Sequence, residues 1–290
     1  VSLTAEQQKE KQRLLEVFQS LKEETGTNEK AYEKLVDELT FTLFNRIAAI
    51  KVSEAHTLIP EIITQRPENG NRSFAHSAFL EQFPEKRNED QEGLVDFIQY
   101  EFQNLSQNLP LYSLSHYYHL LPTAIELKEI IDAFNAVEAD EKDIDPDIWK
   151  SDDVLGWLYE SYNNYKKVAH KDSKAKTEYD KVSIQSQVYT PKWVVKFLVD
   201  NSLGKQYLEM YPYSEIKNKY AIANAPTERV REPKPLHEIK LIDPAMGSGN
   251  FLLYAFDVFY DLYQDQIDNY GADYEERDIP KLILEHNLHG

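Results

Sequence analysis

The chain has 290 residues, a formal net charge of −18 at pH 7 and no cysteine. This length can bury the core of one large domain or of two ordinary ones, and the lack of cysteine excludes disulfides and thiolate metal sites. Phosphate binding relies on clustered Lys and Arg, so the acidity argues against a nucleic-acid footprint over the whole surface. The first residues lack the features of a signal peptide, and no apolar run approaches the length of a membrane span, which predicts a cytoplasmic location.

The first part of the chain is predicted to be helical up to about residue 180. A helix over residues 3–24 has Thr4 as a candidate N-cap, and a second helix begins at Asn28. The second half of that helix is apolar nearly all round, which predicts a central core helix. Residues 60–90 contain Pro, Gly and Asn breakers and are expected to be irregular. Further helices are expected at residues 92–105, 113–121, 123–137 and 151–168.

The pattern changes after residue 189. Residues 190–204 predict a compact helix in which Thr190 is the N-cap, Pro191 takes the first helical position and Gly204 forms the left-handed C-terminal turn. A polar interval over residues 211–235 precedes a short strand within residues 238–243. A helix over residues 250–266 and a last helix over 279–287 follow, and residues 288–290 approach a second strand.

Two glycines stand close together between the predicted strand and the helix, in the run "KLIDPAMGSGNFLLYAF". A strand, a tight glycine loop and a helix form the first half of a nucleotide-binding βαβ unit. Gly247 and Gly249 allow a ligand to lie against the main chain, and one or both are expected to adopt positive φ. The helix N-terminus favours a carboxylate or phosphate, and Asp243 suits an amine or hydroxyl donor.

The residues around these glycines discriminate between ligand classes. A dinucleotide loop needs a third glycine where Leu252 stands, and a P-loop needs Gly-Lys-Ser/Thr where Asn250 and Phe251 follow Gly249. S-adenosylmethionine, an amino acid joined to a nucleoside without phosphate, remains as the candidate ligand.

Two motifs carry a resemblance to a known family. "DPAMGSGNFL" (243–252) resembles the first cofactor motif of N6-adenine DNA methyltransferases, and "YTPKWVVKFLVDNSLG" (189–204) resembles the Thr-Pro motif that lies upstream of it. Residues 38–55 and 152–163 extend the similarity into the helical region. Together these runs resemble PglX-type adenine-specific DNA methyltransferases of BREX phage-defence systems and the related type IIG restriction-methylation enzymes.

The resemblance implies S-adenosyl-L-methionine as the cofactor, no metal, and double-stranded DNA as the substrate, bound mainly by a C-terminal part beyond residue 290. Other phage-defence proteins are implied as partners. The catalytic Asn/Asp-Pro-Pro-aromatic motif of such enzymes does not occur in residues 1–290, so no catalytic residue is assigned and the chain is expected to be an inactive N-terminal fragment. The cofactor-binding residues implied by the motifs are Tyr189, Thr190, Pro191, Asp243, Pro244, Ala245, Gly247, Ser248, Gly249, Asn250 and Phe251.

The resemblance also implies a fold. We expect a mainly α N-terminal domain over residues 1–180, followed by the beginning of an α/β, Rossmann-like class I methyltransferase domain over residues 181–290 with an incomplete sheet. A truncated sheet exposes an edge and apolar faces, which predicts self-association through residues 190–290.

Other interpretations remain open at this point. The acidic helical region also suits a docking module for protein partners of a defence complex, and the cofactor motif also suits a methyltransferase that acts on RNA or protein. His116 and His119 are spaced as a metal pair, but a core or surface role is favoured. The run "SYNNYKK" (161–167) is a candidate DNA contact, although a solvated helix face is the commoner role of such a segment.

Overall fold

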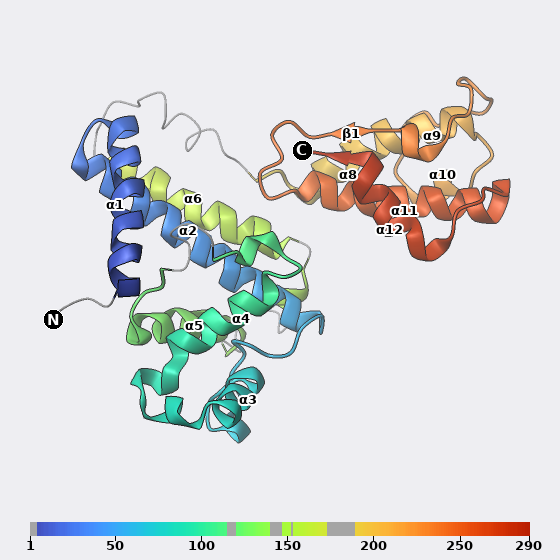
Figure 1. The fold of residues 1–290 in the computed structure, drawn as a ribbon. Coiled ribbons are helices and arrows are strands. Elements are labelled where there is room, and N and C mark those ends of the chain that lie inside the picture. The colour runs from blue at the N-terminus through green and yellow to red at the C-terminus, as the bar shows by residue number, and fades with distance from the viewer. Residues whose placement is uncertain (1–4, 115–119, 140–146, 152, 173–188) are drawn as a thin grey trace. The chain divides into compact units, whose positions relative to one another are not determined.

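The computed structural model describes residues 5–114, 120–139, 147–151, 153–172 and 189–290. The chain divides into two compact units, Val1–Ser151 and Asp152–Gly290, and each is described by itself. Helices dominate the described residues, which contain one parallel sheet of two strands (Figure 1). The mainly α character is therefore confirmed, while the predicted domain boundary at residue 180 lies outside the described residues. None of the described helices is both long and apolar enough to cross a membrane.

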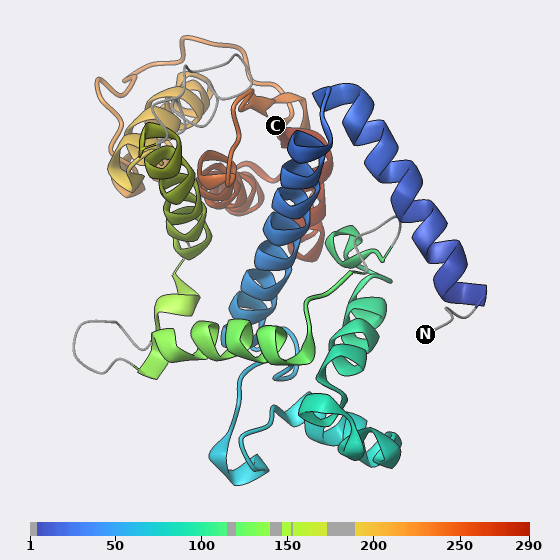
Figure 2. The same ribbon diagram turned by 90° about the vertical axis from the view of Figure 1, so that its left-hand side faces the viewer.

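The first unit is built from helices and short helical turns. Thr27 caps the second helix by accepting a hydrogen bond from the Lys30 N–H at 3.2 Å, which confirms the predicted start at Asn28. Figure 2 shows the first two helices meeting at the turn between Thr25 and Asn28, where Gly26 has a φ of 84°. The predicted cap at Thr4 and most of the predicted helix over 113–121 lie outside the described residues. The helices are α1 (Ala5–Thr25), α2 (Asn28–Ala55), α3 (Phe74–Gln82), α4 (Leu94–Leu105) and α5 (Ala124–Ala139), and the short turns are Pro67–Asn69, Pro84–Asn88, Asp90–Gly93, Pro110–Tyr112 and Ile148–Lys150.

The second half of α2 is buried, as the sequence predicts. Ile47 and Ile50 are fully buried, and three charged side chains, those of Arg46, Lys51 and Glu54, are buried beside them. An amphipathic pattern alone does not indicate such charges, because charged side chains are rarely buried unless they have partners. The helix is therefore a core helix that also carries polar contacts to the chain around it.

Helix α3 corrects the prediction that residues 60–90 are irregular. Ser73 caps it by accepting a hydrogen bond from the His76 N–H at 3.1 Å, and Phe79 and Leu80 are buried on its inner face. The Phe79 ring lies 5.5 Å from the ring of Phe97 in α4, centroid to centroid. Tertiary packing stabilises this short helix, whereas the neighbouring Pro, Gly and Asn residues dominate the sequence pattern.

The second unit places a small sheet among helices. The strand β1 (Leu241–Ile242) pairs in parallel with β2 (Leu288–His289), with Leu241 opposite Leu288. This confirms the predicted strand before the glycine loop and the predicted approach to a second strand. The helices are α6 (Val154–Asp172), α8 (Lys192–Val199), α9 (Lys205–Met210), α10 (Ile216–Lys219), α11 (Asn250–Tyr270) and α12 (Ile279–Leu282), with shorter or wider helical turns at Asp200–Gly204, Leu236–Glu238, Glu276–Asp278 and Ile283–Asn287.

Both predicted ends of the helix over residues 190–204 are wrong. Pro191 is the N-cap of α8, so Thr190 precedes the cap, and no side chain caps this end. Gly204 has a helical φ of −61°, and the helical path continues through it to Met210. The continuation buries Tyr207 and Leu208 in the core of the unit. Packing therefore outweighs the preference of Gly204 for a helix end.

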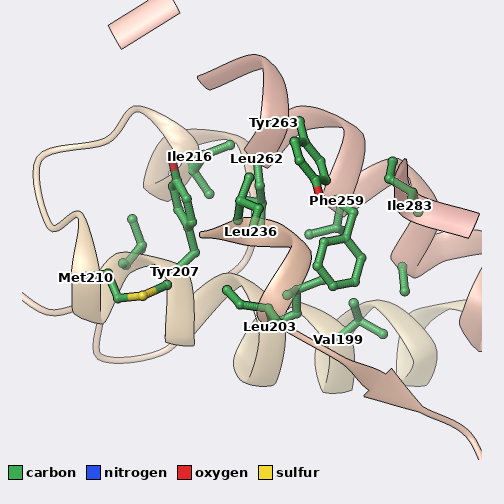
Figure 3. Close-up of a cluster of buried hydrophobic side chains, with 14 of the residues drawn as sticks. Val199, Leu203, Tyr207, Met210, Ile216, Leu236, Phe259, Leu262, Tyr263 and Ile283 are labelled. Atoms are coloured by element: carbon green, nitrogen blue, oxygen red, sulfur yellow. The ribbon is translucent and has the colours of Figure 1, made fainter. Parts of the chain in front are cut away.

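In the core of the second unit, buried side chains on one face of α11 pack against those of α8 and α9. Figure 3 shows Val199 and Leu203 packed near Phe259 and Leu262 of α11. Asn287 is completely buried and ties the start of the sheet to this core, because its Nδ2 donates to the Leu236 and Ile239 carbonyls at 2.8 and 2.7 Å. These contacts hold the chain that enters β1, and thereby fix where the glycine loop begins.

Candidate functional site

The loop after β1 is a compact turn that delivers the chain to the start of α11. The Asp243 N–H donates to the His289 carbonyl at 2.8 Å, which extends the parallel ladder one residue beyond the strand. The Asp243 Oδ1 then accepts from the Ala245 N–H at 3.1 Å. This local bond turns the backbone immediately after the strand. The carboxylate of Asp243 is thereby held at the carboxyl end of β1.

Both glycines of the loop adopt the left-handed conformation that the sequence predicts for one or both of them. Gly247 has a φ of 57°, and Gly249 has a φ of 82° and is the N-cap of α11. A Cβ atom on Gly249 would meet no atom closer than 4.0 Å, so conformation, not crowding by the protein, requires glycine here. Gly247 is exposed, so the main chain is accessible there, whereas Gly249 is buried.

Residues 189–191, called the Tyr-Thr-Pro turn from here on, lie directly against the glycine loop (residues 243–249). Asn250, the first residue of α11, donates from Nδ2 to the Thr190 carbonyl at 3.0 Å. Two segments that are far apart in the sequence are thus joined by a hydrogen bond at the helix N-terminus. The backbone N–H groups at that end favour a negatively charged ligand group.

The same turn is also fastened to α6. The Tyr189 hydroxyl donates to the Asp153 Oδ1 at 2.7 Å, and Lys192 lies 3.7 Å from the same carboxylate. The Tyr189 ring packs on Gly156, where a Cβ atom would lie 2.1 Å from the ring Cε2. Burial, together with the hydrogen bond to Asp153, raises the pKa of the Tyr189 hydroxyl above its ordinary value, so the hydroxyl stays protonated and donates.

A cavity of about 620 Å³ lies between these three elements. That volume is within the range of about 300–1,000 Å³ that is typical of small-molecule sites. The glycine loop, the Tyr-Thr-Pro turn and α6 all contribute to its wall. The lining residues are Tyr159, Glu160, Asn163, Tyr189, Thr190, Asp243, Ala245, Met246, Gly247, Ser248, Asn250 and Phe251.

The charged side chains of the cavity wall are all acidic. Glu160 and Asp243 carry the carboxylates, and no Lys, Arg or His is among the described residues that line the cavity. A site with this charge attracts a ligand that carries positive charge and repels one that carries several phosphates.

Asn163 is the unusual polar group of the wall. The residue is only 7% exposed, and its Nδ2 has no hydrogen-bond partner within the protein. A buried amide left without a partner costs about 1–3 kcal/mol. The cost is removed where a bound water or a ligand supplies the missing acceptor.

The chain is similar in sequence to two known proteins. The chain is 31% identical over 295 residues to the adenine-specific methyltransferase BrxX of Escherichia coli O9:H4 (strain HS), an alignment that covers 90% of this chain and 23% of the relative. It is 26% identical over 307 residues to the adenine-specific methyltransferase PglX of Lacticaseibacillus casei (strain Zhang), covering 90% of this chain and 24% of that protein. The chain is homologous to adenine-specific methyltransferases of BREX systems.

This homology confirms the PglX-type resemblance found in the sequence. The chain spans about a quarter of the length of these two relatives. A comparison with models of known protein families finds no match.

The structure brings most of the predicted cofactor residues to one cavity. Eight of the eleven line it, from both the Tyr-Thr-Pro turn and the glycine loop. The other three, Pro191, Pro244 and Gly249, belong to the same turn and loop but do not line the cavity: Pro191 caps α8 and Gly249 caps α11. The assignment of all eleven residues as cofactor-binding stays a prediction.

Four lining residues were not predicted from the sequence, namely Tyr159, Glu160, Asn163 and Met246. Three of them lie on α6, within residues 152–163, where the sequence resembles the same family but no motif assigns a role. Their spacing of one, three and four residues places them on neighbouring positions of one helix. That spacing was the available signal, but no sequence rule brings α6 to the glycine loop.

The other candidate sites gain no support from the described residues. His116 and His119 lie outside them, and no group of three or more potential metal ligands occurs among the residues that were described. Of the run over residues 161–167, Asn163 lines the cavity, whereas Tyr165 is 77% exposed. A DNA contact through this run stays a prediction.

Proposed function

We propose that the second unit is the S-adenosyl-L-methionine-binding beginning of a Rossmann-like class I methyltransferase domain. We further propose that the protein carrying this chain transfers a methyl group to adenine N6 in double-stranded DNA as part of a BREX phage-defence system. The two relatives are adenine-specific methyltransferases, which supports adenine as the acceptor over a protein side chain. The proposal includes a cytoplasmic location and DNA contacts made mainly outside residues 1–290.

One observation carries this proposal: the glycine loop and the Tyr-Thr-Pro turn line the same cavity and are joined by the Asn250–Thr190 hydrogen bond. Each motif alone has a plain structural explanation, as a loop or as a helix start. Their convergence on a cavity of ligand size favours a binding site formed by both.

The charge of the cavity fits this cofactor. S-adenosylmethionine carries a sulfonium, an ammonium and a carboxylate, and it has no phosphate. The carboxylates of Glu160 and Asp243 suit the positive groups, while the unpartnered Asn163 amide and the N-terminus of α11 suit the carboxylate. A dinucleotide or nucleoside triphosphate would instead bring several negative charges to a wall without a cation.

The chain's own residues are proposed to bind and orient the methyl donor. Tyr189 and Thr190 cover it from the turn, Asp243 accepts from its hydroxyl or amine groups, and the main chain at Gly247 lies against it. When bound, the cofactor supplies an activated methyl group on a positively charged sulfur. Holding that group in a fixed position supplies a large part of the rate enhancement. The reactants then lose their translational and rotational entropy on binding and not in the reaction step.

The adenine pocket lies outside this chain in the proposal. A target base must leave the duplex and stack in a pocket, for which related enzymes use the Asn/Asp-Pro-Pro-aromatic motif that residues 1–290 lack. We therefore expect residues 1–290 alone to show no methyl transfer, whereas the whole protein transfers methyl groups to DNA.

The test compares labelled methyl transfer to double-stranded DNA by the whole protein and by its Asp243→Asn variant. Asparagine keeps an oxygen that can accept from the Ala245 N–H, so the loop is preserved while the charge is lost. We expect cofactor binding and transfer to fall about ten-fold or more, as for loss of a charged hydrogen bond. Unchanged cofactor binding by the variant, or transfer to RNA or protein in place of DNA, would contradict the proposal.

A further inference from the structure

Helix α6 forms a wall of the cavity that lies outside both cofactor motifs in the sequence. Tyr159, Glu160 and Asn163 line the cavity from this helix, although α6 precedes the Tyr-Thr-Pro turn and the glycine loop in the chain. The helix is not loosely placed there. The Tyr189–Asp153 hydrogen bond and the packing of the Tyr189 ring on Gly156 fasten it to the turn.

The Nδ2 of Asn163 contributes no hydrogen bond to the fold. The residue is more than nine-tenths buried, it lines the cavity, and its Nδ2 finds no acceptor within the protein. An amide nitrogen is a donor only, so the missing partner is an acceptor. A carboxylate oxygen makes the strongest such bond, because a charged acceptor strengthens it.

Glu160 stands three residues before Asn163, on the adjacent turn of the helix, and its side chain reaches the same cavity. One helix thus presents a carboxylate and an unpartnered amide donor side by side. This pair is complementary to an α-amino acid, whose ammonium and carboxylate are joined through a single carbon.

We propose that α6 binds the amino-acid end of the methyl donor: the Asn163 amide donates to the α-carboxylate, and the Glu160 carboxylate accepts from the α-ammonium. This inference rests on the proposed function, because it assigns a role within the same site. It adds to that function two specificity-determining residues on a helix that neither motif includes. In this proposal, two contacts position these side chains: the Tyr189–Asp153 hydrogen bond and the packing of the Tyr189 ring on Gly156.

The inference is tested by calorimetric binding to the whole protein with two ligands, S-adenosylmethionine and its decarboxylated analogue. The analogue keeps the sulfonium and the ammonium and lacks only the carboxylate. We expect Asn163→Ala to weaken binding of S-adenosylmethionine by about ten- to a hundred-fold and to leave binding of the analogue unchanged. Asn164→Ala is the matched control, because Asn164 is an exposed residue of the same helix that does not line the cavity.

Glu160→Gln provides the second arm of the test. Both ligands carry the ammonium, so this variant weakens both to a similar degree. Unchanged S-adenosylmethionine binding in Asn163→Ala, or an equal loss of both ligands, overturns the inference; an equal loss indicates a general disturbance of the fold.

The outcomes also separate this inference from the proposed function. A wild-type protein that binds neither ligand overturns both. A wild-type protein that binds S-adenosylmethionine, and loses it in Asp243→Asn but not in Asn163→Ala, overturns the role of α6 alone.

Discussion

Helices α2 and α6 both bury polar side chains, but the two helices differ in whether these side chains have hydrogen-bond partners within the protein. In α2, the Glu54 carboxylate accepts from the Ile62 and Ile63 N–H groups at 2.6 and 2.7 Å, and Lys51 donates to Thr64 and Asn135 at 2.7 and 2.9 Å. In α6, Asn163 is similarly buried, and its Nδ2 has no hydrogen-bond partner within the protein.

The difference separates groups that stabilise the fold from a group for which we propose a ligand as the hydrogen-bond partner. Buried polar atoms are nearly always hydrogen-bonded within the protein, so each exception requires an explanation. Glu54 holds residues 62–64 to α2 through these hydrogen bonds. Burial raises the pKa of its carboxyl group, while hydrogen bonds from Thr64, Ile63 and Ile62 and the charge of Lys51 oppose that change. Asn163, in contrast, lies on a cavity wall.

The largest effect is expected from removing the Glu54 carboxylate. Glu54→Ala leaves the N–H groups of residues 62–64 without their acceptor and removes the negative charge that interacts with buried Lys51. We expect a loss of about 3–5 kcal/mol in the free energy of unfolding, measured by urea denaturation and circular dichroism.

The control for this prediction is Glu24→Ala, which removes an exposed ion pair with Lys34 and is expected to cost at most about 1 kcal/mol. Equal losses in the two variants would show that Glu54 does not hold the fold.

The next largest effect is expected at the contact between α6 and Tyr189. Gly156→Ala improves helix propensity, but its Cβ would lie 2.1 Å from the Tyr189 ring and displace it. We expect S-adenosylmethionine binding to weaken by about 1–3 kcal/mol, as for other overpacked contacts, while the helix content of the protein is unchanged.

Tyr189→Ala gives the reference for a double-mutant cycle. Once the ring is removed, adding Gly156→Ala is expected to have little further effect on cofactor binding, because the two residues act through one contact. Additive losses in the double variant would contradict a shared role of these residues in placing α6.

The smallest effect is expected at two left-handed helix caps, Gly249 and Gly271, which have φ angles of 82° and 64°. Alanine at either position costs about 1–2 kcal/mol of stability, because a Cβ atom disfavours this conformation. Only Gly249→Ala is also expected to weaken S-adenosylmethionine binding, since Gly249 belongs to the loop beside the cavity. Equal binding by both variants, measured by calorimetry, would count against the loop as part of the site.

Local features of the site could be predicted from the sequence, and distant ones could not. The strand, the glycine loop and the start of α11 follow from a short run of residues with strong local preferences, and positive φ at Gly247 follows from its type. The sequence pattern does not predict α3 or the helical path through Gly204, because buried contacts of Phe79 and Tyr207 outweigh local breakers there. The role of α6 depends on tertiary contacts, which no local pattern of Glu160 or Asn163 reveals.

The most direct test of the account is an experimental structure of the whole protein with S-adenosylmethionine bound. The account predicts the cofactor in the cavity between the loop at Gly247 and α6, with its carboxylate within hydrogen-bond distance of the Asn163 Nδ2 and its ammonium near Glu160. A cofactor bound elsewhere, or an Asn163 amide paired with an atom of the protein itself, would contradict it.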